Sequence, residues 1–196
     1  WNKCTEYNIP FIYASSAATY GDGELGYKDD NSIIPNLKPL NPYGESKNEF
    51  DKWIIQQKDA PPKWFGLKFF NVYGPHQMFS NLYTGALTVF AWRLLNDRAP
   101  LLFEDGLQQR DFVHVRDAVA ACCNAMDMVD SGCSVYNIGS GRASTFLEVA
   151  TMLARITGRE HIRPEISGRY REGDIRHCFA DIGKAWTALQ YRPRIF

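Results

Sequence analysis

Two short, mainly apolar runs separated by a helical segment constrain the fold of this chain most strongly. They cover residues 11–14 and 64–70, and runs of this length without alternation are typical of strands buried in a parallel sheet. Between them, residues 45–58 contain neither Gly nor Pro and carry apolar side chains at helical spacing. Strand, helix and strand in this order predict a right-handed βαβ unit, and therefore an α/β fold with a parallel sheet.

Further elements follow in the second half. The sequence predicts helices over residues 84–96, 115–129 and 145–158, and short strands over 101–103, 112–115 and 135–138. Thr145 and Glu148 have the spacing of a capping box. The Gly-Ser-Gly of residues 139–141 lacks the third glycine of a dinucleotide fingerprint, so it is interpreted as a strand-to-helix turn.

Composition excludes several classes of protein. Hydrophobic residues make up 45% of the 196, enough for a buried core, and 22 basic residues balance 22 acidic ones. This balance argues against a nucleic acid or a membrane surface as partner. Arg93 interrupts the longest apolar stretch, well short of the roughly 20 residues that span a bilayer. The five cysteines lack metal-binding spacing, so we expect no metal site and a reducing, cytoplasmic compartment.

The stretch Pro-Tyr-Gly-Glu-Ser-Lys, residues 42–47, carries the most chemistry. Tyr43 and Lys47 lie one helical turn apart, and a neighbouring ammonium favours the phenolate form of a tyrosine. Such a pair can move a proton on and off a sugar hydroxyl. The same spacing also arises by chance in many helices. One side of this helix is expected to carry Tyr43, Lys47, Phe50 and Ile54.

Other polar segments have two interpretations each. Ser15 and Ser16 follow the first strand, where ligands meet an open α/β sheet, although a plain serine-rich turn would look the same. Residues 21–41 form a loop that is either a functional lid or merely mobile. Five arginines between Arg159 and Arg176 either clasp phosphates or form a solvated face.

Six motifs in order resemble the extended short-chain dehydrogenase/reductase family of nucleotide-sugar epimerases and dehydratases. They are Ser-Ser-x-x-x-Tyr-Gly, Pro-Tyr-x-x-x-Lys, Phe-Asn-Val-Tyr-Gly-Pro, Arg-Asp-Phe-Val-His-Val-x-Asp-Ala, Tyr-Asn-Ile-Gly-Ser-Gly and Arg-x-Gly-Asp. The resemblance implies a partial Rossmann-like doubly wound parallel sheet and a small α/β substrate-binding domain. Residues 1–75 would belong to the dinucleotide-binding domain and 76–196 mainly to the substrate domain, with about 111–140 returning to the Rossmann core.

The resemblance also implies roles for individual residues. NAD would be the cofactor and a nucleotide-diphosphate sugar the substrate. The catalytic residues would be Ser16, Tyr43 and Lys47. Cofactor contacts would come from Ser15, Tyr43, Lys47, Phe70 and Val72. Substrate contacts would come from Ser16, Asn71, Leu102, Phe103, Arg110, Arg171 and Asp174, with the two arginines on the diphosphate, Asp174 near the ribose, and Leu102 and Phe103 along the base.

Different parts of the chain resemble different enzymes of this family. Dehydratases of the family carry an Asp-Glu pair where this chain has Ala17 and Ala18. Residues 9–75 are similar to ADP-glycero-manno-heptose 6-epimerases, but Ser80 stands where those enzymes have a second catalytic lysine. From about residue 76 onward the chain is similar to UDP- or dTDP-hexose 4-epimerases. A recombination near residue 75 would explain the disagreement between the two halves.

The family's glycine-rich turn lies in roughly the first hundred residues, before the segment that starts here. The chain is therefore expected to be a fragment. The favoured function is an NAD-dependent hexose 4-epimerase or an inactive part of one. The alternatives are a folded, non-catalytic fragment that oligomerises and a heptose 6-epimerase. A homodimer or other homo-oligomer is expected.

Overall fold

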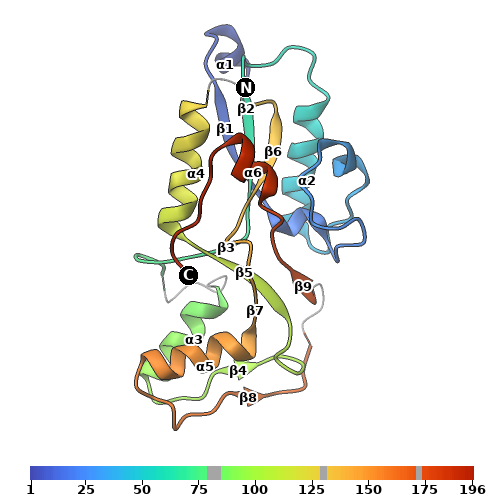
Figure 1. The fold of residues 1–196 in the computed structure, drawn as a ribbon. Helices are drawn as coiled ribbons and strands as arrows, with labels where there is room; N and C mark the ends of the chain where they lie inside the picture. Colours follow the sequence, from blue (N-terminus) through green and yellow to red (C-terminus); the bar gives the residue numbers. More distant parts are fainter. Residues whose placement is uncertain (79–84, 129–131, 171–173) are drawn as a thin grey trace.

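A three-stranded parallel sheet lies at the centre of the computed structural model, which describes residues 1–78, 85–128, 132–170 and 174–196. Its strand order is β1-β2-β6 (Figure 1). The strands are β1 (Phe11–Ser16), β2 (Trp64–Phe69) and β6 (Ser134–Ile138). Both pairings are parallel, with Phe11 opposite Trp64 and Phe65 opposite Ser134. The predicted α/β fold with a parallel sheet is confirmed.

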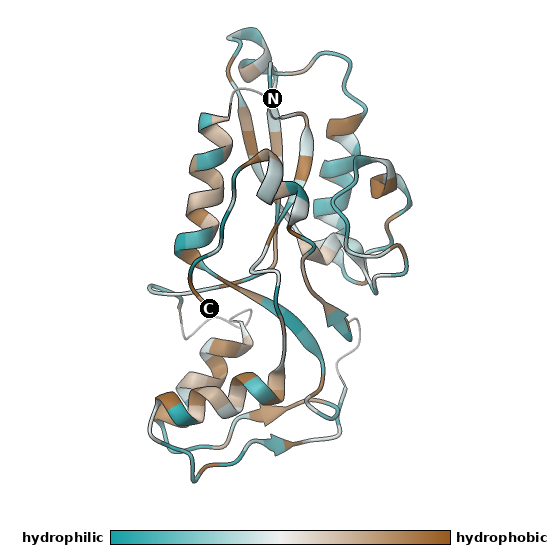
Figure 2. Cartoon of the chain, viewed as in Figure 1, coloured by the Kyte–Doolittle hydropathy of each residue, from teal (hydrophilic) through white to brown (hydrophobic). Residues whose placement is uncertain are grey.

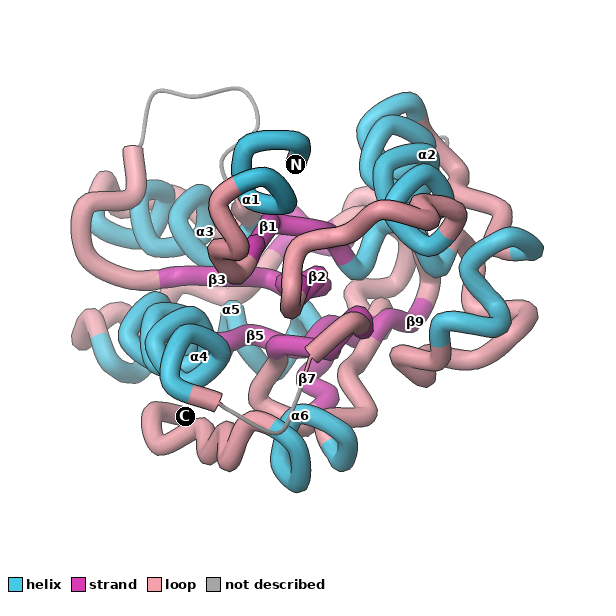
Figure 3. Tube along the Cα trace, turned by 90° about the horizontal axis from the view of Figure 1, so that it is seen from above, coloured by secondary structure: helices cyan, strands magenta, loops and turns pink. Residues whose placement is uncertain are grey.

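Helices cover both faces of this sheet, as in a doubly wound fold. Seen from above, α2 (Pro42–Ile55) and α4 (Val115–Asp127) lie on opposite sides of the strands (Figure 3). On the α4 side, alanines at helical spacing pack on the sheet together with α6 (Gly183–Ala188). The α2 side has its own core, which contains Tyr13, Ile34, Ile54, Trp64 and Val135. Small side chains on α4 allow a close approach of helix to sheet.

A second group of elements lies below the sheet in Figure 1. Its helices α3 (Ala86–Leu95) and α5 (Phe146–Ile156) pack around a core of Phe90, Leu102, Val149 and Ala150. Two short strands, β4 (Leu101–Leu102) and β8 (Glu165–Ile166), pair beside them. The connecting sheet contains β3 (Asn71–Tyr73), β5 (Gln109–His114), β7 (Ala143–Thr145) and β9 (His177–Cys178). The domain boundaries near residue 75 stay a prediction.

Helix α2 buries a largely polar stripe rather than its aromatic residues. The buried members are Gly44, Asn48, Asp51 and Ile54, whereas Phe50 and Trp53 are exposed. Figure 2 accordingly shows α2 as mostly hydrophilic, in contrast to the hydrophobic strands of the sheet. The side that carries Tyr43, Lys47 and Phe50 therefore lies next to the buried stripe, and only Ile54 of the expected four is in the core. A helix that buries polar groups must satisfy them with specific partners.

Two details differ from the sequence-based expectations. The turn at residues 139–141 leads into β7 before α5 begins, so it joins two strands rather than a strand and a helix. Residues 17–20 and 31–36 form the 3-10 helices η1 (Ala17–Tyr20) and η2 (Asn31–Asn36), the second within the expected loop. The chain opens with a short helix, α1 (Asn2–Glu6). Within the described residues no helix is long and apolar enough to cross a membrane.

Candidate active site

Tyr43 and Lys47 stand at the beginning of α2. Asn41 caps the helix, because its Oδ1 accepts a hydrogen bond from the Gly44 amide at 2.8 Å, and Pro42 occupies the first turn. The Tyr43 side chain is 58% exposed. The Lys47 ammonium lies 5.9 Å from the centre of the Tyr43 ring and donates to the Ala14 carbonyl at 2.9 Å. Phenol and ammonium therefore meet at the carboxyl end of β1.

Gly44 explains how α2 comes so close to the turn after β1. A Cβ at this position would lie 2.6 Å from the Ala18 carbonyl oxygen, a distance that real contacts do not allow. Only glycine therefore lets the first turn of α2 pack on η1. Since Tyr43 precedes Gly44, this contact holds the backbone of Tyr43 near the turn that carries Ser16. The sequence motif thus contains a steric requirement in addition to its chemistry.

Both the side chain and the backbone carbonyl of Ser16 accept hydrogen bonds. Its Oγ accepts from the Ala18 amide at 3.2 Å, and its carbonyl accepts from the Thr19 hydroxyl at 2.8 Å. The Ser16 hydroxyl proton is left without an acceptor among the residues that the structure describes. A serine hydroxyl can donate once and accept twice. Ser16 can therefore donate to an oxygen that approaches the end of β1.

Ser15 faces the opposite way, into a buried polar cluster. Its hydroxyl donates to Asp51 Oδ2 at 2.8 Å, and the same carboxylate accepts from Tyr13 at 2.9 Å and from Lys68 at 2.6 Å. Burial lowers the pKa of Lys68, an effect that the Asp51 charge opposes. Burial also raises the pKa of Tyr13 well above its ordinary value. The predicted cofactor contact of Ser15 stays a prediction, and its hydroxyl is already engaged.

Asp51 and Lys68 are not among the site residues predicted from the sequence. Two signals were available. Lys68 interrupts an otherwise apolar buried strand, and Asp51 follows Lys47 by one helical turn, on the side of α2 that packs on β1. A charged residue in such a strand requires a partner. The helix beside the strand is the natural place to look for it.

The end of β2 supplies Phe70, Asn71 and Val72. Phe70 is buried and its amide donates to the Ile138 carbonyl at 3.1 Å. The Asn71 side-chain amide donates to the Asp111 carbonyl at 3.1 Å, which leaves its oxygen as a possible acceptor. Val72 is half-buried in β3 opposite Val113. Their predicted contacts with cofactor and substrate stay predictions.

Arg110 and Asp174, both predicted to bind substrate, form an ion pair with each other. The Arg110 Nη2 atom lies 2.6 Å from Asp174 Oδ1, and the guanidinium lies 5.3 Å from the centre of the Phe146 ring. Leu102 is a core residue at 1% exposure, whereas Phe103 next to it is 41% exposed. Arg171, the second predicted diphosphate ligand, lies outside the described residues.

An apolar cluster connects the Ser16 turn with the Arg110 strand. It contains Ala17, next to Ser16, and Cys178, which stands opposite Arg110 in the β5–β9 pairing. Tyr20 and Phe70 lie between them in the same cluster. Burial raises the pKa of the Cys178 thiol to about 12, which keeps it protonated and inert. The predicted catalytic and diphosphate residues are therefore placed at two ends of one packed unit.

Neither glycine-rich stretch forms a dinucleotide site. At residues 139–141, the Asp111 carboxylate accepts from the amides of Ser140 and Gly141 at 2.6 and 2.8 Å, so the chain's own carboxylate fills this anion-binding turn. Gly21, Gly23 and Gly26 have the spacing G-x-G-x-x-G, but all three lie in turns at positive φ and no α-helix follows them before residue 42. A pyrophosphate site of this type needs a helix N-terminus.

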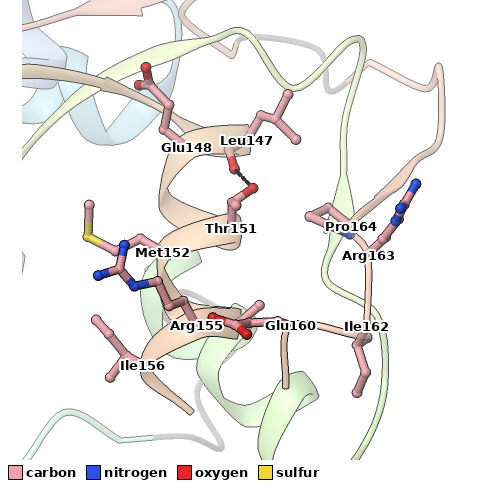
Figure 4. Close-up of a pocket in the computed structure, with 11 residues that line it drawn as sticks. Leu147, Glu148, Thr151, Met152, Arg155, Ile156, Glu160, Ile162, Arg163 and Pro164 are labelled. Carbon is pink, nitrogen blue, oxygen red and sulfur yellow. Dashed lines mark hydrogen bonds between the residues drawn. The ribbon is translucent and has the colours of Figure 1, made fainter. Parts of the chain in front are cut away.

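A wide depression lies elsewhere, along α5 and the segment that follows it (Figure 4). Its volume is about 1010 Å³, and Thr151 on its wall donates its hydroxyl to the Leu147 carbonyl. None of the predicted site residues lines it. Within the described part of the chain, no three His, Cys, Asp or Glu side chains form a group that could hold a metal ion.

The geometry at the end of β1 fits a nicotinamide ribose. Lys47 uses one N–H on Ala14, so two donors of its ammonium remain, and the Tyr43 hydroxyl is exposed beside them. These two residues would hold the ribose hydroxyls of NAD.

Comparison with known proteins identifies the family of the chain. Residues 1–139 match the model of the NAD dependent epimerase/dehydratase family. The chain is 45% identical over 169 residues to the ADP-L-glycero-D-manno-heptose-6-epimerase of Fusobacterium nucleatum, a match that covers 79% of this chain and 49% of that enzyme. The chain thus spans about half the length of the curated relatives it matches.

Solved structures of the same family share the fold. The UDP-glucose 4-epimerase of Thermotoga maritima with UDP-glucose has a TM-score of 0.85 and 30% identity, covering 100% of this chain and 62% of that one. The UDP-glucose 4-epimerase of Thermus thermophilus in complex with NAD has a TM-score of 0.80 and 27% identity, with the same coverage of 100% and 62%. The chain, with its parallel sheet and its Tyr-x-x-x-Lys helix packed on a serine turn, belongs to the NAD-dependent epimerase/dehydratase family.

Proposed function

We propose that this chain carries the catalytic and sugar-nucleotide side of an NAD-dependent nucleotide-sugar epimerase. One observation carries the proposal: the Tyr43–Lys47 pair of α2 lies against the turn that presents Ser16 at the carboxyl end of β1. Ligands bind at this edge of open α/β sheets. The family membership makes NAD the expected cofactor.

The three side chains have complementary tasks. Tyr43 would remove the proton of a sugar hydroxyl and later return it, while the Lys47 ammonium stabilises the phenolate. Ser16 would donate a hydrogen bond to the same sugar oxygen, which supports the carbonyl form of the sugar. Tyr43 and Lys47 would hold NAD, which would supply reversible hydride exchange with the sugar carbon. The chain itself positions the sugar and moves the proton.

The other end of the substrate would be bound by residues around Arg110. Its guanidinium would exchange the Asp174 carboxylate for a phosphate, which a planar fork binds well. Phe103 is exposed and can stack on a base. Leu102 is buried, so it would support the base site only by packing in the core below Phe103. Asn71 would contact the first phosphate, Asp174 the ribose, and Arg171 the diphosphate.

Two observations favour different sugars. Ser80, rather than lysine, follows the Gly-Pro of residues 74–75, which supports the predicted hexose 4-epimerase. The 45% identity to a heptose 6-epimerase supports that enzyme as the second candidate. Both reactions would use the same Tyr, Lys and Ser, because each would pass through a ketone formed by hydride loss. The site chemistry therefore supports both, and the sugar pocket must distinguish them.

The open edge of the sheet supports the alternative function, a non-catalytic fragment that oligomerises. In the described residues β1 pairs only with β2, so its outer edge is open to another strand. Unpaired edges promote association, and Phe50 and Trp53 lie exposed on the neighbouring α2. We propose that the chain forms a homodimer or other homo-oligomer and acts in the cytoplasm. Light scattering of the purified chain tests the oligomeric state.

Calorimetric titration tests the epimerase proposal. The purified chain is titrated with NAD, UDP-galactose and ADP-glycero-manno-heptose, and Arg110→Ala is expected to weaken the binding of the sugar nucleotide. UDP-galactose binding alone supports the 4-epimerase, and ADP-heptose binding alone the 6-epimerase. A folded oligomer that binds none of the three ligands would overturn the proposal in favour of the non-catalytic fragment.

Replacing Tyr43 by phenylalanine tests the catalytic assignment. Tyr43→Phe should leave the free energy of unfolding unchanged, because the phenol is exposed. In the complete enzyme it should lower turnover by about 10²- to 10⁴-fold, the usual contribution of a general acid/base. Turnover is measured as the conversion of the sugar nucleotide in the presence of NAD. An unchanged rate in the variant would remove Tyr43 from the mechanism.

A further inference from the structure

A chain of three polar contacts connects the buried carboxylate of α2 with the backbone of Ser16. Lys68 Nζ donates to Asp51 Oδ2 at 2.6 Å and to Thr19 Oγ1 at 2.7 Å. The Thr19 hydroxyl donates in turn to the Ser16 carbonyl at 2.8 Å. The side chains of Lys68 and Asp51 are at most 1% exposed, and Thr19 is fully buried. No solvent competes for any of these bonds.

The chemistry of the donors orients every bond in this chain. An ammonium can only donate, so Thr19 must accept from Lys68. The single proton of the Thr19 hydroxyl is then directed to the Ser16 carbonyl. Ser16 is thereby fixed through its carbonyl, while its own Oγ is fixed by the Ala18 amide. What remains free is the Ser16 hydroxyl proton.

The same carboxylate also fixes the register of α2 against β1. Lys47 and Asp51 lie one turn apart on the helix and contact successive residues of the strand, the Ala14 carbonyl at 2.9 Å and the Ser15 hydroxyl at 2.8 Å. Two anchors at adjacent turns prevent the helix from sliding along the strand. Tyr43, one turn before Lys47, is therefore held at a constant height relative to the Ser16 turn.

Stability alone does not account for an ion pair in this place. Two charges in the core lose their hydration, and an apolar pair of similar volume often stabilises a protein as well or better. Lys68 also lies 5.1 Å from the centre of the Tyr20 ring, so the ammonium is surrounded by the turn on one side and α2 on the other. It contacts both of the elements that carry the proposed catalytic residues.

We propose that Lys68 and Thr19 are positioning residues for the Ser16 hydroxyl, and that Asp51 aligns Lys68 and α2 for the same purpose. The inference rests on the proposed function of Ser16 and extends it to residues that cannot touch a substrate. A change at Thr19 should therefore alter the Ser16 turn without loss of the ion pair below it.

Thr19→Val is the test, because valine keeps the shape of threonine and removes only its hydroxyl. Thr19→Ser keeps the hydroxyl and serves as the rescue. Thr88→Val, at a buried threonine of α3, is the matched control far from the site. Amide hydrogen exchange of the 196-residue chain is followed residue by residue, together with urea unfolding and calorimetric titration with UDP-galactose and, separately, with ADP-glycero-manno-heptose.

In Thr19→Val the amides of Ala18 and Gly21 should exchange about 2- to 10-fold faster, the range of one lost hydrogen bond, while exchange in α4 and α5 is unchanged. Thr19→Ser should restore the slow rates, and affinity for the sugar nucleotide should fall and recover with them. Exchange that stays unchanged, or that rises evenly across the chain, would overturn the positioning role. If the wild-type chain binds neither sugar nucleotide in the titrations, the proposed function is refuted instead. The hydrogen-exchange comparison still tests the positioning role, because it needs no ligand.

Discussion

The two halves of the molecule use ion pairs in opposite ways. Beneath the catalytic end of the sheet, Lys68 and Asp51 pair at 2.6 Å with side chains no more than 1% exposed. In the second half, Arg176 binds Asp105 at 2.7 Å with side chains 40% and 50% exposed, and it also binds Glu104. The distances are alike, but the surroundings differ. A buried pair is costly to break, whereas an exposed pair contributes little to stability.

This difference matches what each end would do. Proton transfer needs groups held in a constant position, and a buried ion pair that also binds the neighbouring turn provides that. A site for a nucleotide diphosphate must exchange its own carboxylates for the ligand's phosphates. In the Arg110–Asp174 pair the aspartate side chain is 28% exposed and the arginine side chain 9%, so a ligand would reach the pair from the Asp174 side. We therefore propose that the molecule combines a rigid catalytic end with an adjustable nucleotide end.

The largest effect is expected at the buried pair. Lys68→Met leaves Asp51 charged and unpaired in the core, which should lower the free energy of unfolding by about 3–5 kcal/mol in urea denaturation. The double variant Lys68→Met, Asp51→Leu removes both charges and should recover most of this loss. If the single variant is as stable as wild type, the contrast between the two halves disappears.

The next largest effect is expected in the apolar core of the second half, where packing rather than ion pairs should provide the stability. Leu102→Ala opens a cavity beside Phe90 and Val149 and should cost about 2–5 kcal/mol. Phe103→Ala, at the exposed neighbour, should change unfolding little and should weaken sugar-nucleotide binding. Equal losses of stability in the two variants would contradict the assignment of Leu102 to the core and Phe103 to the surface.

The smallest effect is expected at the exposed pair. Hydrogen bonds from Arg176 hold the pKa of Asp105 below its usual range. A depressed carboxyl pKa stabilises the fold above the unfolded pKa of about 3.9, and this contribution is lost as the pH falls through the folded pKa. Arg176→Gln should therefore raise the pKa of Asp105 towards its ordinary value, measured by carboxyl NMR titration, with little change in unfolding at pH 7. A large loss of stability at pH 7 would show that the exposed pair also has a structural role.

Much of the fold followed from local sequence. The apolar runs of β1 and β2, the capping box of α5 and the breaker-free stretch of α2 were each predicted and are present. Such signals are local, because helix caps and buried strands depend on residues a few positions apart. The proximity of Tyr43 and Lys47 has the same origin. The short strand β7 was missed, since only its pairing with β5 makes residues 143–145 a strand.

The partners of buried polar groups could not be predicted in this way. Lys68 is 17 residues from Asp51 and 49 from Thr19, and Asp111 binds a turn about 30 residues away. A sequence shows that a buried charge needs a partner but not which side chain the fold brings to it. By itself, the sequence determined the α/β class and the Tyr-Lys pair, because both depend on spacing along one helix or strand. Only the tertiary structure decided that the Ser15 hydroxyl, and not that of Ser16, binds Asp51, because that choice depends on packing α2 against two parallel strands.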